Sequence, residues 1–301
     1  MRKGFMARNL EDPVKEERFL QRIKEEFPDI TWKTYRYITQ GWDHVVLILD
    51  ETIVFRAPKD MLYRNEFKNE IRLLQYLKKK VNLGIPDYIY VSRDGSFAGY
   101  NLVKGQELTT SQFQNLTASE KETAANQLAE FITTLHATPQ SVLKRCQVRT
   151  ENLEEMYEEL VRDTRALLYP RLPEKYIQSI EQYFDELETA LGGNHPKALV
   201  HNDLGWEHIL WDSQKKQINI IDFSDRSLGD PAIDFTGLQE YGMAFTTQVF
   251  ELYRGKKDED MLYRSELYFK RVPLYFMKDA LQGYPCTFEE GYEALKNQFK
   301  A

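Results

Sequence analysis

Two acidic residues at the ends of short apolar runs carry the chemical signal of this chain. In the stretch LVHNDLGWEHILWD, an apolar run leads to Asp203, and His208 follows five residues later. In the stretch INIIDF, Asp222 directly follows a second β-type run. Phosphoryl transfer needs such a pair, because one carboxylate orients the attacking hydroxyl and accepts its proton, while the second holds Mg²⁺ on the triphosphate. The alternative is a strand end that only carries two histidines.

A third carboxylate stands where an apolar side chain is expected. Residues 62–80 have helical spacing, and Glu70 falls inside the apolar stripe that starts at Phe67. A carboxylate on a core-facing stripe is costly unless it has a cationic partner. Arg56 is the better candidate because it lies within an apolar run, and Lys59 just past that run is the other. Alternatively, Glu70 lies at the rim of the core and reaches water.

The expected elements separate a β-rich front from a helical back. Residues 198–200 and 218–223 predict a small hairpin embedded in the helical region. We therefore expect an α+β protein in which a β-rich lobe, residues 1–104, precedes a mainly helical lobe, residues 105–301. The expected strands are 31–40, 44–50, 52–58, 88–94 and 97–103, with a tight turn at Asp50-Glu51, and the expected helices are 19–27, 62–80, 118–136, 151–168, 174–191, 235–253, 259–281 and 288–299.

The net charge of −7 conceals an asymmetry between these two regions. Residues 1–104 carry 19 Lys and Arg against 15 Asp and Glu, a net +4, whereas residues 105–301 carry 21 against 32, a net −11. A basic front and an acidic back suggest lobes with different ligands, an anion in the first and a cation in the second. Solubility alone explains the asymmetry equally well.

Composition argues against several classes of protein. The 301 residues are 42% hydrophobic, enough for a large core, and the 29% of charged residues mix both signs, unlike a disordered chain. The first residues are too charged for a secretory signal, and no apolar run approaches the roughly 20 residues that span a bilayer. No basic run with interleaved aromatics indicates nucleic-acid binding. Cys146 and Cys286 do not suggest a disulfide framework. We expect a cytoplasmic monomer.

These motifs resemble those of the aminoglycoside phosphotransferase family, a branch of the protein-kinase-like fold. HNDLGWEH resembles its catalytic loop, usually His-x-Asp, four variable residues and Asn. IDFSD resembles its counterpart of the kinase Asp-Phe-Gly motif, and GDPAIDF its Gly-Asp-Pro-x-x-Asp-Phe signature. FAGYNLVKGQELT and HND look most like gentamicin-type 2″-phosphotransferases, while HNDLGWEHIL and DPAIDF also look like macrolide 2′-phosphotransferases. The resemblance implies a bilobal fold with a nucleotide-binding N-terminal lobe and a hinge at about residues 100–104.

By position, the resemblance implies roles for residues in two loops. We call HNDLGWEH the catalytic loop and IDFSD the metal loop. Asp203 is the catalytic carboxylate, and Asp222 and His208 ligate Mg²⁺. Glu70 is the helix glutamate of the kinase-like ion pair. Arg56 stands where most members carry lysine, which keeps the charge but not the shape. His208 replaces an amide, and because imidazole suits manganese better than magnesium, Mn²⁺ is an alternative metal.

The resemblance also places the phosphate donor. The loop 39–44, with Gly41 as its single glycine, covers the phosphates; a plain β-hairpin is an equally good interpretation. Tyr100 guards the back of the base pocket, and the backbone from Asn101 to Val103 is the hinge that reads a purine. Bulky aromatics at this position accompany the use of GTP in gentamicin-type relatives, so we expect GTP to be used at least as well as ATP. The alternative is that Tyr100 only packs against the neighbouring strand.

The acceptor is a small molecule with a hydroxyl group. The resemblance places Asp225 near it, and Glu240 is a further acidic candidate. Aminoglycosides are polycations whose sites are lined with acids, which suits the acidic second lobe. A macrolide site would be more apolar, and residues 271–277 offer such a wall. A cellular amino-alcohol or sugar kinase and a catalytically decayed, nucleotide-binding pseudokinase are further alternatives, although the intact carboxylates argue against the latter. We expect a small-molecule kinase acting on an antibiotic, with an aminoglycoside as the first choice.

Overall fold

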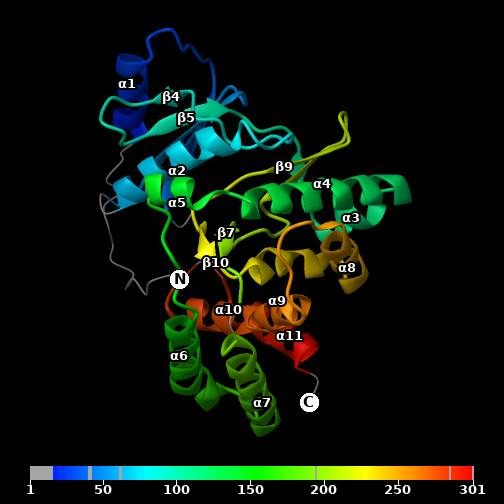
Figure 1. The fold of residues 1–301 in the computed structure, drawn as a ribbon. Coiled ribbons are helices and arrows are strands. Elements are labelled where there is room, and N and C mark those ends of the chain that lie inside the picture. Colours follow the sequence, from blue (N-terminus) through cyan, green and yellow to red (C-terminus); the bar gives the residue numbers. More distant parts are fainter. Residues whose placement is uncertain (1–15, 40–42, 61–62, 194, 285, 300–301) are drawn as a thin grey trace.

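The N-terminal part of the molecule is an antiparallel sheet with a helix on each face. The computed structural model describes residues 16–39, 43–60, 63–193, 195–284 and 286–299. Five strands are ordered β1-β2-β3-β5-β4, and helices α1 (Glu16–Glu26) and α2 (Arg64–Leu77) flank them (Figure 1). The strands are β1 (Tyr35–Ile38), β2 (His44–Leu49), β3 (Ile53–Pro58), β4 (Tyr90–Val91) and β5 (Ala98–Asn101).

The two faces of this sheet pack on different helices because strand side chains alternate. Leu47 and Phe55 belong to a buried cluster with Phe19 of α1, whereas Ile48 and Val54 belong to the larger core that contains α2. β2 and β3 are joined at Asp50-Glu51, whose φ angles are 45° and 51°. A two-residue hairpin turn that matches the strand twist needs positive φ at both positions. The predicted tight turn is confirmed.

Helix α2 has the predicted apolar stripe. Phe67, Ile71, Leu74 and Leu77 are all buried, and Glu70 is buried with them at 1% exposure. The alternative of a glutamate at the rim of the core is therefore wrong. A carboxylate this far from water must find cationic or hydrogen-bonding partners within the protein.

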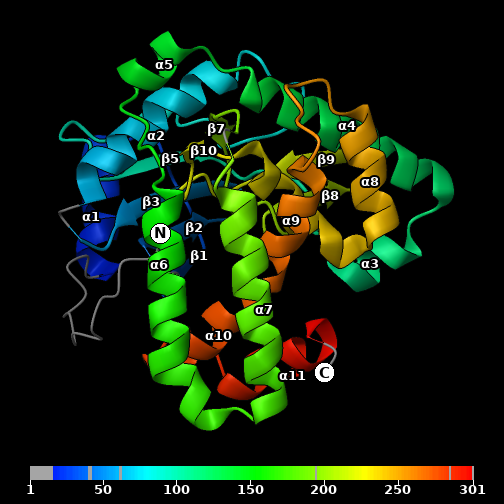
Figure 2. The same ribbon diagram turned by 60° about the horizontal axis from the view of Figure 1, so that its bottom comes forward.

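The C-terminal part is mainly helical, with two small sheets between its helices and α2. The helices α6 and α7 run side by side at the far end of the molecule (Figure 2). The helices are α3 (Thr110–Asn115), α4 (Ala118–His136), α5 (Gln140–Arg145), α6 (Leu153–Asp163), α7 (Glu174–Leu191), α8 (Met243–Leu252), α9 (Met261–Lys270), α10 (Val272–Leu281) and α11 (Phe288–Gln298), with the shorter η2 (Thr164–Leu168), η3 (Tyr169–Arg171), η4 (Pro231–Phe235) and η5 (Gly237–Tyr241). The strands are β6 (Gln106–Glu107), β7 (Ala198–Val200), β8 (Ile209–Asp212), β9 (Gln217–Ile220) and β10 (Ser227–Gly229).

The strand pairing in this part differs from the sequence prediction. Strand β7 pairs with β10, and β9 pairs with β8, which in turn pairs with β6. The apolar runs 198–200 and 218–223 are therefore strands, but they do not form a hairpin with each other. The expectation fails because the run at 209–212, which lies between them and precedes a turn, is the sequence-adjacent partner of β9.

Two long predicted helices are interrupted. The first, 235–253, is a short 3-10 segment followed by α8, because Gly242 at the junction has a φ of 100° that no helix tolerates. The second, 259–281, divides into α9 and α10 at Arg271, and Pro273 occupies the first turn of α10, where its missing N–H costs no hydrogen bond.

The architecture agrees with the fold class predicted from the sequence: an antiparallel N-terminal sheet with a mainly helical C-terminal part. The division of the chain at residue 104 remains a prediction. Among the described residues, no helix combines the length and apolar character that a bilayer crossing requires.

Candidate active site

The loop that carries Asp203 follows β7 and is held by two acids, the buried Asp234 and the partly exposed Glu151. The backbone N–H groups of His201 and Asn202 both donate to the carboxylate of Asp234, at 3.0 Å. Asn202 has a left-handed φ of 70°, which asparagine tolerates better than most residues. Its side-chain amide donates to Glu151 Oε1 at 2.6 Å. Asp203, whose side chain is 38% exposed, therefore follows a firmly held turn.

Strand β9 leads into the second carboxylate, Asp222. Its φ of 60° is unusual for a residue with a side chain and marks a strained position of the kind found at functional sites. Asp222 Oδ1 accepts from Arg56 Nη2 at 3.2 Å. Burial on its own would raise the pKa of Asp222, but Arg56 and then His208 hold that pKa well below its usual range. Asp222 is therefore ionised at neutral pH.

His208 lies between the two carboxylates. Its Nδ1 is 2.8 Å from the main-chain oxygen of Asp203 and 3.5 Å from Asp203 Oδ2, while its Nε2 is 3.9 Å from Asp222 Oδ2. Because a carbonyl oxygen only accepts, Nδ1 carries the proton, and the neutral ring offers the Nε2 lone pair on the side of Asp222. Burial lowers the pKa of His208, but the charges of Asp203 and Asp222 outweigh burial and raise it overall.

The donor set formed by Asp222 and His208 fits a divalent cation that arrives with a nucleotide. Ligand distances of about 2.0–2.2 Å allow one ion to contact both Asp222 Oδ2 and His208 Nε2. Within the described parts of the chain, no group of three or more His, Cys, Asp or Glu side chains is placed to hold a metal ion. Mg²⁺ commonly takes one or two protein ligands plus substrate phosphates, so two are sufficient. The imidazole nitrogen also suits Mn²⁺.

Arg56 connects the sheet, helix α2 and the metal loop. Its Nη1 donates to Glu70 Oε1 and to the Tyr88 hydroxyl, both at 3.3 Å. Its Nη2 lies 3.2 Å from Asp222 Oδ1, 3.2 Å from His44 Nδ1 and 3.0 Å from Ser224 Oγ. The predicted ion pair between Arg56 and Glu70 is confirmed. A lysine, with a single nitrogen, lacks the fork that spans these partners.

Glu70 is shared by a second arginine. Its Oε2 is 3.6 Å from Arg226 Nη1, and the Arg226 side chain is almost fully buried. Arg226 also donates to the main-chain oxygens of Phe223, at 3.0 Å, and Glu66, at 2.8 Å. Since Phe223 follows Asp222 and Glu66 lies on α2, Arg226 fastens the loop that carries Asp222 to the helix.

Two further predictions concern the front of the site. Gly41, the proposed glycine of the phosphate-covering loop, lies outside the residues that the structure describes. Lys59, the alternative partner for Glu70, donates instead to the main-chain oxygen of Thr39. Arg56 is thus the residue that lies beside both Glu70 and the metal loop.

Tyr100 lies on β5 with its side chain buried. Its ring packs edge-to-face on Tyr88, with ring centroids 5.1 Å apart and planes at 90°. Burial raises the pKa of Tyr100 to about 12, against the opposing effect of Arg56. The phenol is therefore neutral, and it lies close enough to Arg56 to share its electrostatic environment. This position is compatible with a bulky residue behind a base pocket.

The hinge continues from β5. Leu102 N–H donates to the main-chain oxygen of Thr52 at 2.7 Å. Because successive residues of an extended segment direct their backbone groups to alternate sides, those of Asn101 and Val103 point away from β3. These are the groups that the sequence assigned to purine recognition.

The two candidate acceptor-binding acids differ in their surroundings. Asp225 pairs with Arg149, whose Nη2 is 3.3 Å from Asp225 Oδ1, and its main-chain oxygen accepts from Asn202 Nδ2 at 2.8 Å. Burial and then the charge of Glu207 raise the pKa of Glu240 to about 7. Asp225 is therefore next to the catalytic loop but already paired, while Glu240 is half-ionised near neutral pH.

Several residues of this site were not singled out from the sequence. His44 at the start of β2 and Tyr88 in the loop before β4 both contact Arg56. Nothing in the local sequence pattern around either residue indicates this contact. Asn219 carried a signal, because it is a polar residue within an apolar run and such residues need buried partners, but Arg226, whose neighbours are Asp225 and Ser227, carried none. Glu207 lies within the catalytic-loop motif, although only its neighbour His208 was considered.

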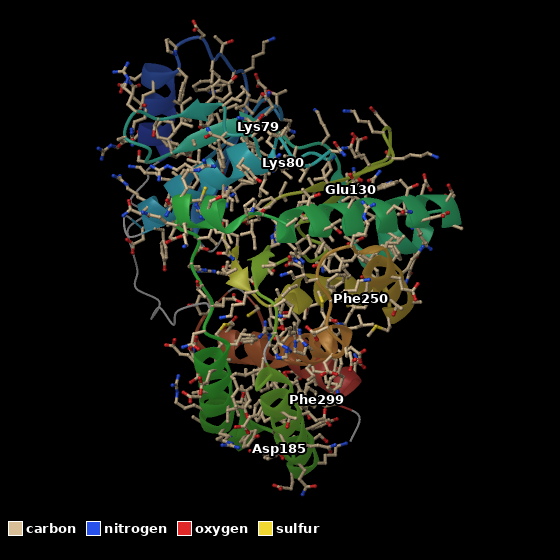
Figure 3. The ribbon with its side chains drawn as sticks, viewed as in Figure 1. Lys79, Lys80, Glu130, Asp185, Phe250 and Phe299 are labelled. Atoms are coloured by element: carbon tan, nitrogen blue, oxygen red, sulfur yellow. The ribbon has the colours of Figure 1, made fainter. Side chains whose placement is uncertain are left out.

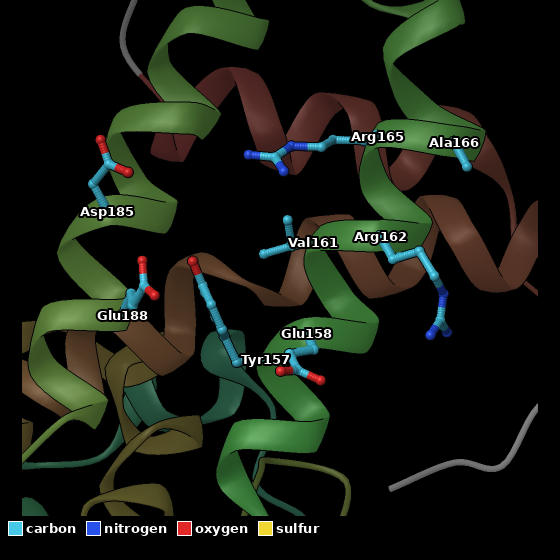
Figure 4. A pocket seen from close by; sticks show the side chains of 8 residues that line it. All are labelled: Tyr157, Glu158, Val161, Arg162, Arg165, Ala166, Asp185 and Glu188. Carbon is cyan, nitrogen blue, oxygen red and sulfur yellow. The ribbon is translucent and has the colours of Figure 1, made fainter.

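A separate groove lies between α6 and α7 (Figure 4). Its volume is about 790 Å³, and Tyr157, Arg165, Asp185 and Glu188 are among its lining residues. Arg165 is already paired there with Glu181 at 2.6 Å. None of the predicted site residues lines this groove, which is therefore separate from the predicted site at the loops after β7 and β9.

Solved structures with a similar architecture include aminoglycoside and macrolide phosphotransferases. The GDP and kanamycin complex of APH(2″)-IIIa is 26% identical, with a TM-score of 0.83 over 93% of this chain and 97% of that chain. The streptomycin–ATP complex of APH(2″)-IIa is 22% identical, with a TM-score of 0.70 over 94% and 97%. A macrolide 2′-phosphotransferase type I is 19% identical, with a TM-score of 0.66 over 96% and 98%. The APH(2″)-IIa and macrolide phosphotransferase structures, at 22% and 19% identity, support the fold alone.

Sequence comparison with protein families gives the assignment. The model described as the phosphotransferase enzyme family matches residues 34–262, which is well over half of the chain and includes Asp203, His208 and Asp222. The chain therefore belongs to the phosphotransferase enzyme family.

Proposed function

We propose that this chain is a small-molecule kinase that transfers the γ-phosphate of GTP or ATP to a hydroxyl group of an antibiotic, with an aminoglycoside as the first candidate. One observation carries the proposal: His208 lies between Asp203 and Asp222, 3.5 Å and 3.9 Å from their carboxylate oxygens, while Arg56 lies 3.2 Å from Asp222. A base, a metal-binding pair and a cation for phosphate thus lie within one small volume. This is the set that phosphoryl transfer uses.

Each residue has a distinct task in this proposal. Asp203 orients the acceptor hydroxyl and accepts its proton as the oxygen attacks phosphorus. Asp222 and His208 would hold a divalent cation, which would supply positive charge to the phosphates. Arg56, kept in place by Glu70, offers its guanidinium to phosphate oxygens. The backbone of Asn101 and Val103 binds the purine.

The acidic charge of residues 105–301 favours a cationic acceptor. Glu207 is close enough to Glu240 for its charge to raise the pKa of Glu240, and these two acids are the candidate contacts for the amino groups of the acceptor. The relatives solved with kanamycin and streptomycin bind such molecules. One observation favours a macrolide as the second candidate: Arg149 already neutralises Asp225, which leaves less negative charge beside the catalytic loop.

A substrate panel tests the proposal. Purified protein is incubated with GTP or ATP, Mg²⁺ and kanamycin, gentamicin or erythromycin, and release of nucleoside diphosphate is measured. We expect acceptor-dependent release with an aminoglycoside, and release that is slower by about 10²–10⁴ from Asp203→Ala. Release with erythromycin alone would favour the macrolide alternative. No release with any acceptor, although nucleotide binds, would favour a cellular metabolite or the decayed-kinase alternative.

A further inference from the structure

Asn219 is a buried polar side chain within the apolar strand β9, and its amide bonds to two other segments. Its side-chain oxygen accepts from the Gly84 N–H at 2.6 Å, and its side-chain nitrogen donates to the Lys104 main-chain oxygen at 2.7 Å. Asn219 is only 4% exposed. Gly84 belongs to the loop after α2, and Lys104 belongs to the hinge. We call these three residues the amide clasp.

The loop after α2 is shaped to reach Asn219. A Cβ atom at Gly84 would lie 2.7 Å from Asn219 Oδ1, which is closer than real contacts of this kind. The Ile220 N–H donates back to the Gly84 main-chain oxygen at 2.9 Å. The same loop is tied to α4, because Asn82 donates to Glu130 Oε1 at 2.9 Å. Figure 3 labels Glu130 and, at this end of α2, Lys79 and Lys80.

The clasp fixes one end of the hinge. The other end is held by the hydrogen bond from Leu102 N–H to Thr52. Just after Lys104, Gly105 has a φ of 117°, and a Cβ there would lie 2.9 Å from a main-chain carbon of Trp211 on β8. Val103 therefore lies between two fixed points, and its backbone groups have little freedom to move.

The strand that holds the hinge also delivers the metal ligand. Asp222 follows Asn219 by three residues along the same segment. A nucleotide bound here spans from the hinge, which reads its base, to Asp222, which serves its phosphates. We propose that Asn219 is a positioning residue that fixes the hinge backbone relative to Asp222, and so sets how well the base of a nucleotide fits. The inference rests on the proposed function, since it takes the nucleotide to bind at this hinge.

The test compares ligands with and without a base. Asn219→Asp keeps the oxygen that accepts from Gly84 but loses the donor to Lys104. Mg²⁺–GTP, Mg²⁺–ATP and Mg²⁺–tripolyphosphate are titrated into wild type and variant by calorimetry. We expect the Kd of the better nucleotide to rise about tenfold, the effect of one lost hydrogen bond, with the Kd of tripolyphosphate within about twofold of wild type. In steady state, the nucleotide KM rises and kcat stays within about twofold.

Gln217→Ala is the matched control. Gln217 lies on the same strand and donates to the main-chain oxygen of Asn82 in the same loop, at 3.2 Å, but it does not bond to the hinge. Its nucleotide Kd should stay at the wild-type value. If Asn219→Asp does not fold, as judged by circular dichroism, Gly84→Ala disturbs the clasp from the opposite side and should give the same loss confined to nucleotides.

The outcomes separate the clasp from the proposed function. A wild-type protein that binds tripolyphosphate but neither nucleotide would overturn both. The clasp alone would be overturned if the wild-type protein binds a nucleotide and the folded clasp variants bind it with the same Kd as Gln217→Ala. Equal loss for nucleotide and tripolyphosphate would also overturn it, because a hinge contact affects only ligands that have a base.

Discussion

Replacing Glu70 with glutamine should destabilise the protein strongly. The substitution keeps the shape of the side chain but removes the charge between the guanidinium groups of Arg56 and Arg226, at 3.3 Å and 3.6 Å. Removing one partner of a buried ion pair costs about 3–5 kcal/mol. Arg56 keeps Asp222 at 3.2 Å as a second counter-charge, which favours the lower end, about 3 kcal/mol. This loss is a large share of the free energy of unfolding of a typical domain, which is about 5–15 kcal/mol.

Equilibrium unfolding in urea measures this loss. Glu66→Gln is the matched control, because Glu66 lies one turn earlier on α2 and its carboxylate is 3.8 Å from Arg226, but its side chain is 49% exposed. An exposed pair contributes about 0–1 kcal/mol. If Glu70→Gln costs no more than Glu66→Gln, then Glu70 is not the shared counter-charge, and the account of how α2 and the metal loop are joined is wrong.

The remaining predictions concern ligands. Arg56→Ala should raise the nucleotide KM about 10–100-fold and Lys59→Ala should not, as steady-state kinetics would show; the reverse would make Lys59 the phosphate contact. Wild type should use GTP at least as well as ATP, and Tyr100→Ala should shift preference toward ATP; a wild type that strongly prefers ATP contradicts this. Mn²⁺ should support at least as much activity as Mg²⁺, and His208→Asn should reverse the order; an unchanged metal profile would remove His208 from the site. Because the pKa of Glu240 is about 7, its charge appears as pH rises, so the KM of a cationic acceptor should fall between about pH 6 and 8, and Glu240→Gln should abolish that dependence.

The parts of the fold that the sequence predicted correctly depend on local patterns. The β2–β3 hairpin has its turn at Asp50-Glu51, and the apolar stripe of α2 includes Glu70, because strand and helix periodicity are properties of neighbouring residues. The pairing of Glu70 with Arg56 was also predictable. A buried carboxylate needs a cation, and few cations lie within apolar runs of the front lobe.

The parts that the sequence did not predict depend on contacts between distant residues. Arg226 meets the main-chain oxygen of a residue 160 positions earlier, and Asn219 meets Gly84, 135 positions earlier. A polar residue in an apolar run signals that a partner exists but not which one. The helix predicted across 235–253 fails for a related reason, since apolar spacing continues through Gly242 while the backbone there adopts a positive φ.

The central claim is that Asp203 serves the acceptor while Asp222, His208 and Arg56 serve the nucleotide. The most direct test measures acceptor-dependent nucleoside diphosphate release and nucleotide Kd for wild type and Asp203→Ala, with the best acceptor of the substrate panel. We predict that turnover falls by about 10²–10⁴, the usual contribution of a general base, while Kd stays within about twofold. A Kd that weakens as much as turnover, or turnover that survives the substitution, would contradict this division of roles.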